Sequence, residues 1–401
     1  MTEREIPRQR PVHQYHQELG AVTDSIVGWD LPLYYEHNEK RCDEFKLPDH
    51  VDGPAAIGVE VLSTRQDVGL HDGLVVTPIE IWGPSAPEFV QRAFTNDMAI
   101  TSGQVRYTLL LDDDGRYMGD VIVTRLEDDR YLMLTAPSQV SRQTERLRDI
   151  AAGDVCIMDQ DDGYTCIGVY GPKAKKVVQP LTDADLSRDA FPYFTSQQIE
   201  IAGVPVIANA VSYVGEFGWE LWTRPGYEPH LWEALWEAGQ DHSILPFGDI
   251  ALFSMAVEKG FTPYETNLDQ TIDMVSPANT PFEANLGHAI DMETDFVGKE
   301  ALERAMDEGG DRRLCCITLD ADLVLPDLRE SVYAGGDDVG DVIRSDYGYT
   351  TQQNIVYAYL PNEFVEPGTR VEVESDGEQY PATVREEPLY DPGAERMIHD
   401  P

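Results

Sequence analysis

A ten-residue motif, Ser212 to Leu221, reads S-Y-V-G-E-F-G-W-E-L and holds residues well suited to bind a ligand. Gly215 and Gly218 can adopt backbone angles that other residues avoid, so the motif predicts a turn that leads into a strand. Strand alternation then places Trp219 and Glu220 on opposite faces. A carboxylate on an inward face needs a partner, because a buried unpaired charge is costly. A flat heterocycle with two adjacent N–H donors would be such a partner.

The other polar residues of this motif allow more than one interpretation. Glu216 lies between the two glycines, and we expect its carboxylate to accept hydrogen bonds from the backbone N–H groups of the turn. Glu220 is the better candidate for binding a ligand. Tyr213 fits either a ligand contact or core packing.

Asp120 is the candidate catalytic residue. It precedes an apolar strand, 121–126, in the segment Y-M-G-D-V-I-V-T-R-L. A carboxylate at such a position can hold a substrate nitrogen and orient its lone pair, although an aspartate at a strand start can also be a simple turn residue. Tyr107, on the preceding strand, could form the wall of a flat pocket. The acids at 112–114 are expected in a solvated hairpin loop.

Other signals in the sequence indicate no further chemistry. The chain has no G-x-S-x-G, no P-loop and no G-x-G-x-x-G after a strand, which argues against hydrolases, nucleotidases and dinucleotide-dependent dehydrogenases. Glu258 and Lys259 end a helix, where a salt bridge is the expected role. His13 and His16 are expected near an exposed N-terminus. The five cysteines show no metal-ligand spacing, so we expect no disulfide and no metal site.

Two similar α+β units position these residues. The first is predicted to contain a strand that runs from Val75 through Ile81, the turn Gly83-Pro84, a helix, strands at 105–111, 117–126 and 131–135, and a helix at 138–151. The second is predicted to contain a strand at 165–170, the turn Gly171-Pro172, a helix, strands at 198–207 and 219–223, and a helix at 227–239. A helix at 248–260 ends at a glycine. Residues 312–385 have the pattern of a small all-β domain.

The charge of the chain is strongly one-sided. Acidic residues number 73 against 30 basic ones, a net charge of −43 spread along the whole chain, with only seven lysines. Such a surface predicts a halophilic type of protein, because molar salt screens the repulsion. Phosphate binding needs a basic patch, so nucleic acid is not an expected partner. No apolar run approaches the roughly 20 residues that span a bilayer, and no apolar signal segment begins the chain. We therefore expect a cytoplasmic protein that does not contact membranes.

The order of motifs resembles the glycine-cleavage T-protein (aminomethyltransferase) superfamily, most closely the folate-binding part of dimethylglycine and sarcosine dehydrogenases. Motifs that carry the resemblance are H-Q-E-L-G-A, G-W-D-L-P, I-E-I-W-G-P-S-A, G-D-V-I-V-T-R-L, S-Y-V-G-E-F-G-W-E-L, A-V-E-K-G-F, N-L-G-H-A-I, D-F-V-G-K-E-A-L and P-L-Y-D-P-G-A-E-R. Each motif alone is weak, and their shared order is the signal.

The resemblance implies an α+β fold, a three-domain cloverleaf of T-protein type. Two related α+β units would surround a central folate site, and a small β-barrel would follow. The implied ranges are 1–155 with part of 240–305, then 156–240 as a ferredoxin-like unit, then 310–401. Asp120 matches the family's catalytic aspartate. Tyr107, Tyr193, Tyr213 and Glu220 match folate contacts, with Glu220 accepting two N–H groups of the pterin. The family often carries an acid just before the catalytic aspartate, whereas Gly119 stands there.

The implied activity is transfer of an aminomethyl or methyl group between a small amine, or a carrier-bound aminomethyl group, and tetrahydrofolate or an archaeal reduced pterin analogue. A lipoyl carrier protein or a separate flavoprotein amine oxidase would be the partner. Two alternatives stay open. One is folate-dependent demethylation of a methylated small molecule, and the other is a non-catalytic folate-binding protein. The stretch Lys259-Gly260-Phe261 lacks the cysteine of the non-catalytic relatives, which counts against the second.

Overall fold

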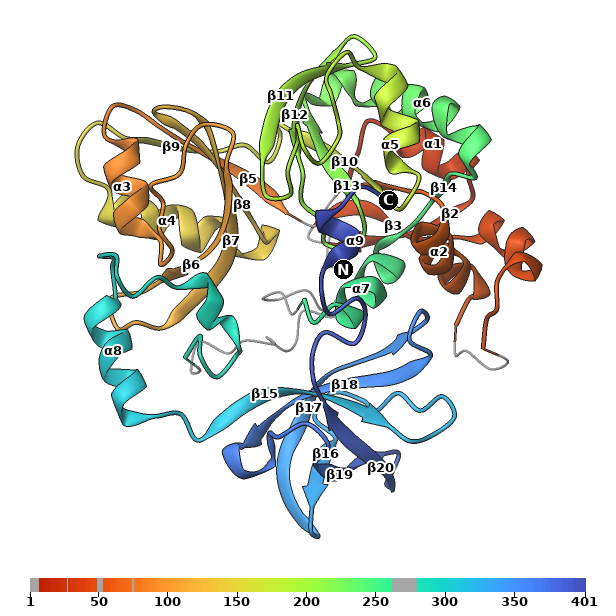
Figure 1. The fold of residues 1–401 in the computed structure, drawn as a ribbon, viewed down its shortest axis with the longest axis vertical. Helices are drawn as coiled ribbons and strands as arrows, with labels where there is room; N and C mark the ends of the chain where they lie inside the picture. The colour runs from red at the N-terminus through yellow and green to blue at the C-terminus, as the bar shows by residue number, and fades with distance from the viewer. Residues whose placement is uncertain (1–6, 27, 49–52, 74–75, 262–279) are drawn as a thin grey trace, which may run out of the picture.

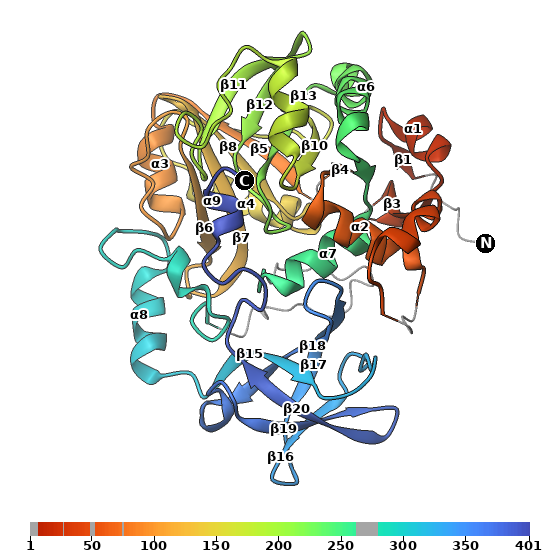
Figure 2. The same cartoon turned by 45° about the vertical axis from the view of Figure 1, so that its right-hand side comes forward.

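The computed structural model describes residues 7–401 apart from 27, 49–52, 74–75 and 262–279. Three lobes are visible, two built on β-sheets flanked by helices and one built as a barrel (Figures 1 and 2). Helix α7 (Asp249–Glu258) lies between the barrel and the rest of the molecule in both views. This α+β architecture with a separate β-barrel confirms the predicted fold class.

The first lobe contains a five-stranded antiparallel sheet in the order β6-β7-β8-β5-β9. Its strands are β5 (Thr77–Trp82), β6 (Val105–Leu111), β7 (Tyr117–Glu127), β8 (Arg130–Thr135) and β9 (Cys156–Asp159). Helices α3 (Ala86–Ala93) and α4 (Val140–Ile150) bury their apolar sides against the outer face of this sheet. The predicted hairpin at 112–115 joins β6 to β7. Val75, the predicted start of the first strand, lies outside the described residues.

The second lobe contains a six-stranded sheet in the order β11-β12-β13-β10-β4-β14. Its strands are β4 (Gly69–Asp72), β10 (Thr165–Tyr170), β11 (Ser196–Ile201), β12 (Val204–Asn209), β13 (Gly218–Thr223) and β14 (Leu245–Pro246). Helices α5 (Ala174–Val178) and α6 (Glu228–Gly239) pack on its outer face together with Trp219.

Two details of the second lobe differ from the predicted pattern. The single strand expected at 198–207 is a hairpin, β11 and β12, because Ala202 and Gly203 adopt positive φ angles of 50° and 78° and reverse the chain. Strand β4 comes from the range 1–155, yet it pairs with β10 and β14. The predicted boundary between the first two domains at residue 155 therefore does not divide the strands of the two sheets, because β4 precedes residue 155 and belongs to the second sheet.

The N-terminal segment adds a three-stranded sheet and two helices beside the second lobe. These elements are β1 (Arg8–Gln9), β2 (Ala21–Ile26), β3 (Trp29–Tyr35), α1 (His13–Glu18) and α2 (Ala55–Gln66). His16 is not near an exposed terminus as predicted, because its ring is 1% exposed. Its Nε2 lies 2.8 Å from Asp72 Oδ2, and its Nδ1 lies 2.9 Å from the hydroxyl oxygen of Tyr35.

The C-terminal lobe is a closed barrel in the order β15-β18-β17-β16-β19-β20, as the all-β pattern of 312–385 predicted. Its strands are β15 (Arg312–Leu319), β16 (Ser331–Ala334), β17 (Asp337–Gly348), β18 (Gln353–Pro361), β19 (Arg370–Ser375) and β20 (Glu378–Arg385). Helix α8 (Lys299–Glu308) precedes the barrel, and α9 (Glu395–Ile398) follows it. After the barrel the chain returns to the centre of the molecule, where α9 lies (Figures 1 and 2).

The inner faces of the two larger sheets contribute to one shared core. Leu132 and Leu134 of β8 pack in the same cluster as Ile207 of β12 and Trp222 of β13. Helix α7 and the barrel complete this cluster, since Leu252 and Met255 on the helix and Tyr347 and Tyr349 from the barrel side belong to it. Across the described ranges no helix has the length and apolarity to cross a membrane, and no set of three metal-ligating side chains gathers.

Candidate active site

Asp120 is held by two tyrosine hydroxyl groups. Tyr107 donates to Oδ2 over 3.0 Å, and Tyr117 donates to Oδ1 over 2.6 Å. The pairing of β6 with β7 explains the first contact, because Tyr107 lies opposite Ile122 and Asp120 lies opposite Leu109, which puts Tyr107 and Asp120 on one face of the sheet. The carboxylate is thus a fixed acceptor whose orientation is set by the sheet.

The two phenols remain donors over the physiological pH range. Burial raises the pKa of both Tyr107 and Tyr117, and the adjacent charge of Asp120 raises both further. Tyr213 is close enough to contribute to the raised pKa of Tyr107. The ring of His288 stacks on Tyr107 with centroids 5.7 Å apart and planes 9° from parallel.

Gly119 has a structural reason to replace the acid that often precedes the aspartate. Its φ is +143°, and a Cβ atom there would lie 2.2 Å from Nε2 of Gln143. Gln143 is fully buried, donates to the carbonyl of Met118 over 3.1 Å and accepts from Thr135 over 2.7 Å. In this chain the position beside Asp120 is therefore filled by α4 rather than by a second carboxylate.

Glu220 projects from the inner face of the six-stranded sheet, opposite to Trp219 as predicted. The side chain is 4% exposed, and its Oε2 accepts a hydrogen bond from Trp222 Nε1 over 3.1 Å. Oε1 has no hydrogen-bond partner among the described residues. Burial raises the pKa of Glu220 to about 7, and the bond from Trp222 offsets only part of that rise. A buried carboxylate with one open oxygen is suited to receive N–H donors.

Tyr193 and Tyr213 flank the two acids. The hydroxyl of Tyr193 donates to Sδ of Met397 over 3.4 Å. Burial raises the pKa of Tyr193, Arg188 lowers it, and the charge of Glu220 raises it again, so Tyr193 lies within electrostatic range of Glu220. Tyr213 stacks on Phe261 with centroids 6.1 Å apart and planes 20° from parallel. Each acid therefore has at least one aromatic ring beside it.

The two acids lie on facing sheets. Ile122, which shares the face of Asp120, packs against the same apolar cluster as Trp222, which shares the face of Glu220. The structure thus places Asp120 with Tyr107 on one inner face and Glu220 on the other, around one shared interior. Tyr117 and Trp222 were not predicted as site residues from the sequence. Tyr117 stands three residues from Asp120, and Trp222 stands two residues from Glu220.

Glu216 plays a different part from the predicted one. Among the described residues its carboxylate accepts hydrogen bonds from side chains of two distant segments and not from N–H groups of the turn. Arg65 Nη1 lies 3.1 Å from Oε1, the Tyr390 hydroxyl 2.6 Å from Oε1, and Arg396 Nη1 3.0 Å from Oε2. The prediction was wrong because these partners lie more than a hundred residues from Glu216 along the chain.

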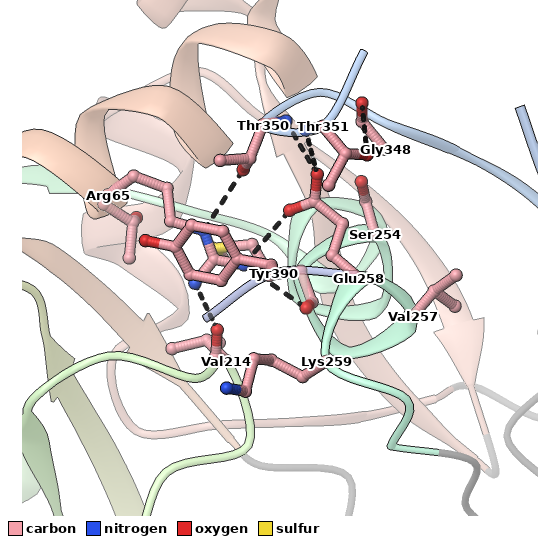
Figure 3. A network of polar contacts seen from close by, with 12 residues as sticks. Arg65, Val214, Ser254, Val257, Glu258, Lys259, Gly348, Thr350, Thr351 and Tyr390 are labelled. Atoms are coloured by element: carbon pink, nitrogen blue, oxygen red, sulfur yellow. Dashed lines mark hydrogen bonds and ion pairs between the residues drawn. The ribbon is translucent and has the colours of Figure 1, made fainter. Parts of the chain in front are cut away.

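Arg65, which pairs with Glu216, also contacts Glu258 of α7, and Glu258 in turn contacts the barrel side at Thr350 and Thr351 (Figure 3). Its Nη2 lies 3.1 Å from Oε2 of Glu258, and its guanidinium lies 4.0 Å from the ring centre of Tyr390. Oε1 of Glu258 accepts from the backbone N–H groups of Thr350 and Thr351 over 2.7 and 2.8 Å. Lys259 pairs with Asp391 at 3.4 Å. The salt-bridge role predicted for Glu258 and Lys259 is confirmed.

Comparisons with known proteins agree with this architecture. The GCVT N-terminal domain matches residues 12–294, and the glycine cleavage T-protein C-terminal barrel domain matches residues 312–391. The chain is 32% identical to an aminomethyltransferase of Saccharopolyspora erythraea, over 96% of this chain and 98% of that protein. It is 32% identical to mitochondrial dimethylglycine dehydrogenase of Mus musculus, over 93% of this chain but 43% of that enzyme.

A solved structure shares the fold. Aminomethyltransferase T of the glycine cleavage system from Bartonella henselae superposes with a TM-score of 0.80 over 96% of this chain and 99% of that one, at 22% identity. Together the two domain matches account for the sheet lobes and the barrel in the order in which they occur here. The chain therefore belongs to the glycine cleavage T-protein family.

Proposed function

We propose that this protein is a transferase that moves a one-carbon unit, aminomethyl or methyl, from a small amine or a carrier-bound aminomethyl group to tetrahydrofolate. The match to aminomethyltransferases over nearly the full length of both chains supports the reaction class. The observation that carries the proposal for this chain is the pair of acids on facing sheets, Asp120 held by two phenols and Glu220 buried with one open oxygen.

The described residues fit a reduced pterin. Glu220 offers a buried carboxylate to a ligand edge with adjacent N–H groups, and desolvation strengthens such charge-assisted bonds. Tyr107, Tyr193 and Tyr213 supply flat aromatic surfaces for a planar ring. An archaeal reduced pterin analogue would present a similar ring to the same residues.

Asp120 has the geometry of an electrostatic catalyst. The folate supplies the nitrogen that accepts the one-carbon unit. Asp120, anchored through both oxygens, keeps a fixed negative charge where positive charge develops on nitrogen, and a fixed charge needs little reorganisation during the reaction. The protein needs no covalent nucleophile of its own.

The identity of the donor distinguishes two versions of the proposal. An aminomethyl group on a lipoyl carrier protein is favoured by the full-length aminomethyltransferase relatives. A methylated amine, handled with a separate flavoprotein amine oxidase, is favoured by the similarity to dimethylglycine dehydrogenase, of which this chain covers 43%. A non-catalytic folate-binding protein would bind the ligand and turn over neither donor.

Calorimetric titration with tetrahydrofolate in molar salt tests the binding step. We expect saturable binding to the wild-type protein, strongly weakened binding to Glu220→Gln, and near-normal binding to Asp120→Asn. Aminomethylated lipoyl carrier is then supplied, followed by dimethylglycine and sarcosine, each with a flavoprotein amine oxidase and its electron acceptor, and methylene- or methyl-folate is measured. Absence of wild-type binding would overturn the proposal, and binding without transfer from any donor would favour the non-catalytic alternative.

A further inference from the structure

Asn209 lies directly opposite Glu220 in the pairing of β12 with β13. Residues opposite each other in an antiparallel pair project from the same face with Cβ atoms about 5 Å apart. The Asn209 side chain therefore stands beside the Glu220 carboxylate on the inner face of the sheet.

The amide of Asn209 lacks the partners that a buried amide needs. The residue is 0% exposed, and neither Oδ1 nor Nδ2 has a hydrogen-bond partner among the described residues. Leaving such a group unpaired costs about 1–3 kcal/mol per group, so native structures rarely keep one without a ligand or an ordered water. The other buried asparagine amides of the described chain differ, since Asn354 contacts Ala321 and Val324 and Asn38 contacts Glu60 and Pro246.

The opposite flank of Glu220 is closed. Gly168 pairs with Glu220 on the neighbouring strand, and the ring of Tyr170 lies over it, 2.5 Å from where a Cβ atom would stand. Trp222 occupies Oε2 of the carboxylate. The Tyr170 hydroxyl on that flank also has no partner among the described residues. A ligand that reaches Oε1 therefore lies between this phenol and the amide of Asn209.

We propose that Asn209 is a second residue that recognises the ligand ring. Its Nδ2 donates a hydrogen bond to a ring carbonyl, next to the two N–H groups that donate to Glu220. This inference rests on the proposed function. Together the two side chains select an edge with the order acceptor, donor, donor, which the 4-oxo, N3–H and 2-amino groups of a pterin provide. Glu220 alone contacts only the two donors, so it leaves the 4-oxo oxygen without a partner.

The test compares tetrahydrofolate with its 2,4-diamino analogue, using calorimetry under anaerobic conditions in molar salt. We expect the wild-type protein to prefer the 4-oxo ring. Asn209→Leu should weaken tetrahydrofolate binding by about tenfold or more and reduce that preference, because one ring hydrogen bond disappears. Asn209→Asp, which keeps the shape but offers an acceptor, should weaken tetrahydrofolate binding at least as strongly and shift the preference towards the 4-amino ring, because a carboxylate would face the 4-oxo oxygen.

Stability of the ligand-free protein provides an independent readout. Asn209→Leu should keep or raise the melting temperature, since it removes an unpaired buried amide. Asn354→Ala is the matched control, because it should lower the melting temperature and leave both dissociation constants unchanged. Unchanged ring preference in both Asn209 variants would overturn the inference while wild-type binding upholds the proposed function. If the wild type binds neither ring, both fail.

Discussion

Tyr117 and Asp120 lie three residues apart on one strand, and the tyrosine hydroxyl donates to the carboxylate over 2.6 Å. A regular strand would alternate their side chains to opposite faces. The register shift between Leu110 and Leu111 on the partner strand marks the irregularity that brings them together. The candidate catalytic acid is thus oriented by its own strand and by Tyr107 from the next one.

Replacing Asp120 with asparagine should reduce turnover at least about tenfold, because it removes the fixed negative charge while keeping the shape. Tetrahydrofolate binding should change far less, since we propose that Glu220 makes the main contacts to the ring. Initial rates at saturating donor, together with a direct dissociation constant, separate the two effects. Near-normal turnover in this variant would remove Asp120 from the mechanism.

Tyr117→Phe should lower turnover through Asp120 rather than through the ligand. The hydroxyl touches the carboxylate, and its loss removes a charged hydrogen bond of about 1.5–3 kcal/mol. Combining Tyr117→Phe with Asp120→Asn should therefore give less than the product of the two single effects. Strictly multiplicative rate losses in the double mutant would contradict this coupling.

Tetrahydrofolate affinity should depend on pH through Glu220. Burial raises the pKa of this group from 4.5 to about 7 in the ligand-free fold, so below pH 7 the carboxyl is protonated and must lose its proton before it can accept two N–H groups. Affinity should fall by up to about tenfold per pH unit below 7 and level off above it. Glu220→Gln should bind weakly without this pH dependence. A wild-type affinity that is flat from pH 5.5 to 8 would refute the assignment.

The same raised pKa affects the stability of the ligand-free protein in the opposite sense. Between pH 4.5 and about 7 the folded state holds a proton on Glu220 that the unfolded chain has released. This group therefore lowers stability as pH rises across that window. Bound ligand should remove that loss, which melting curves with and without tetrahydrofolate can measure.

Arg65→Met should destabilise the fold by about 3–5 kcal/mol, because it leaves the buried carboxylates of Glu216 and Glu258 without their shared cation. Arg41→Met is the control, since Arg41 pairs with a half-exposed Glu44 and should cost less than about 1 kcal/mol. Denaturant midpoints of both variants, measured in the same salt, give the comparison. Equal losses would show that the Arg65 network contributes no more than a surface pair.

The excess of acidic residues predicts that the stability of the fold depends on salt concentration. With a net charge of −43, the melting temperature should fall as salt drops below about 0.5 M, where the repulsion is less screened. Potassium and sodium chloride at equal ionic strength should act alike if screening is the cause. A melting temperature independent of salt would refute the halophilic interpretation.

The sequence predicted the positions of residues that depend on local pattern better than the positions of residues that depend on strand pairing. Alternation placed Glu220 on the inner face, and the hairpin at 112–115 follows from local turn chemistry. Asn209 faces Glu220 because β12 extends to residue 209 and pairs with β13, whereas the predicted strand ended at residue 207. Whether an amide lies opposite an acid depends on strand register, which a single sequence does not reveal.

Glu216 shows the same limit at longer range. Its local setting between glycines suggested backbone partners, whereas its real partners come from α2 and from the segment after the barrel. No local rule links these segments, because their contacts depend on how the three lobes assemble. The motif at 212–221 therefore predicted strand β13 and the inward-facing Glu220, but it did not predict the side chains that hold the turn before this strand.

The return of the chain from the barrel has a consequence for biosynthesis. Arg396 donates to the backbone carbonyl of Arg65, 331 positions away in the sequence, and to the carboxylate of Glu216. Tyr390 and Arg396 follow the strands of both sheets and the barrel in the sequence, so the turn that launches β13 gains these two anchors only after the barrel has been synthesised. A chain cut before Tyr390 would lack both anchors, and of these contacts to Glu216 only the one from Arg65 would remain.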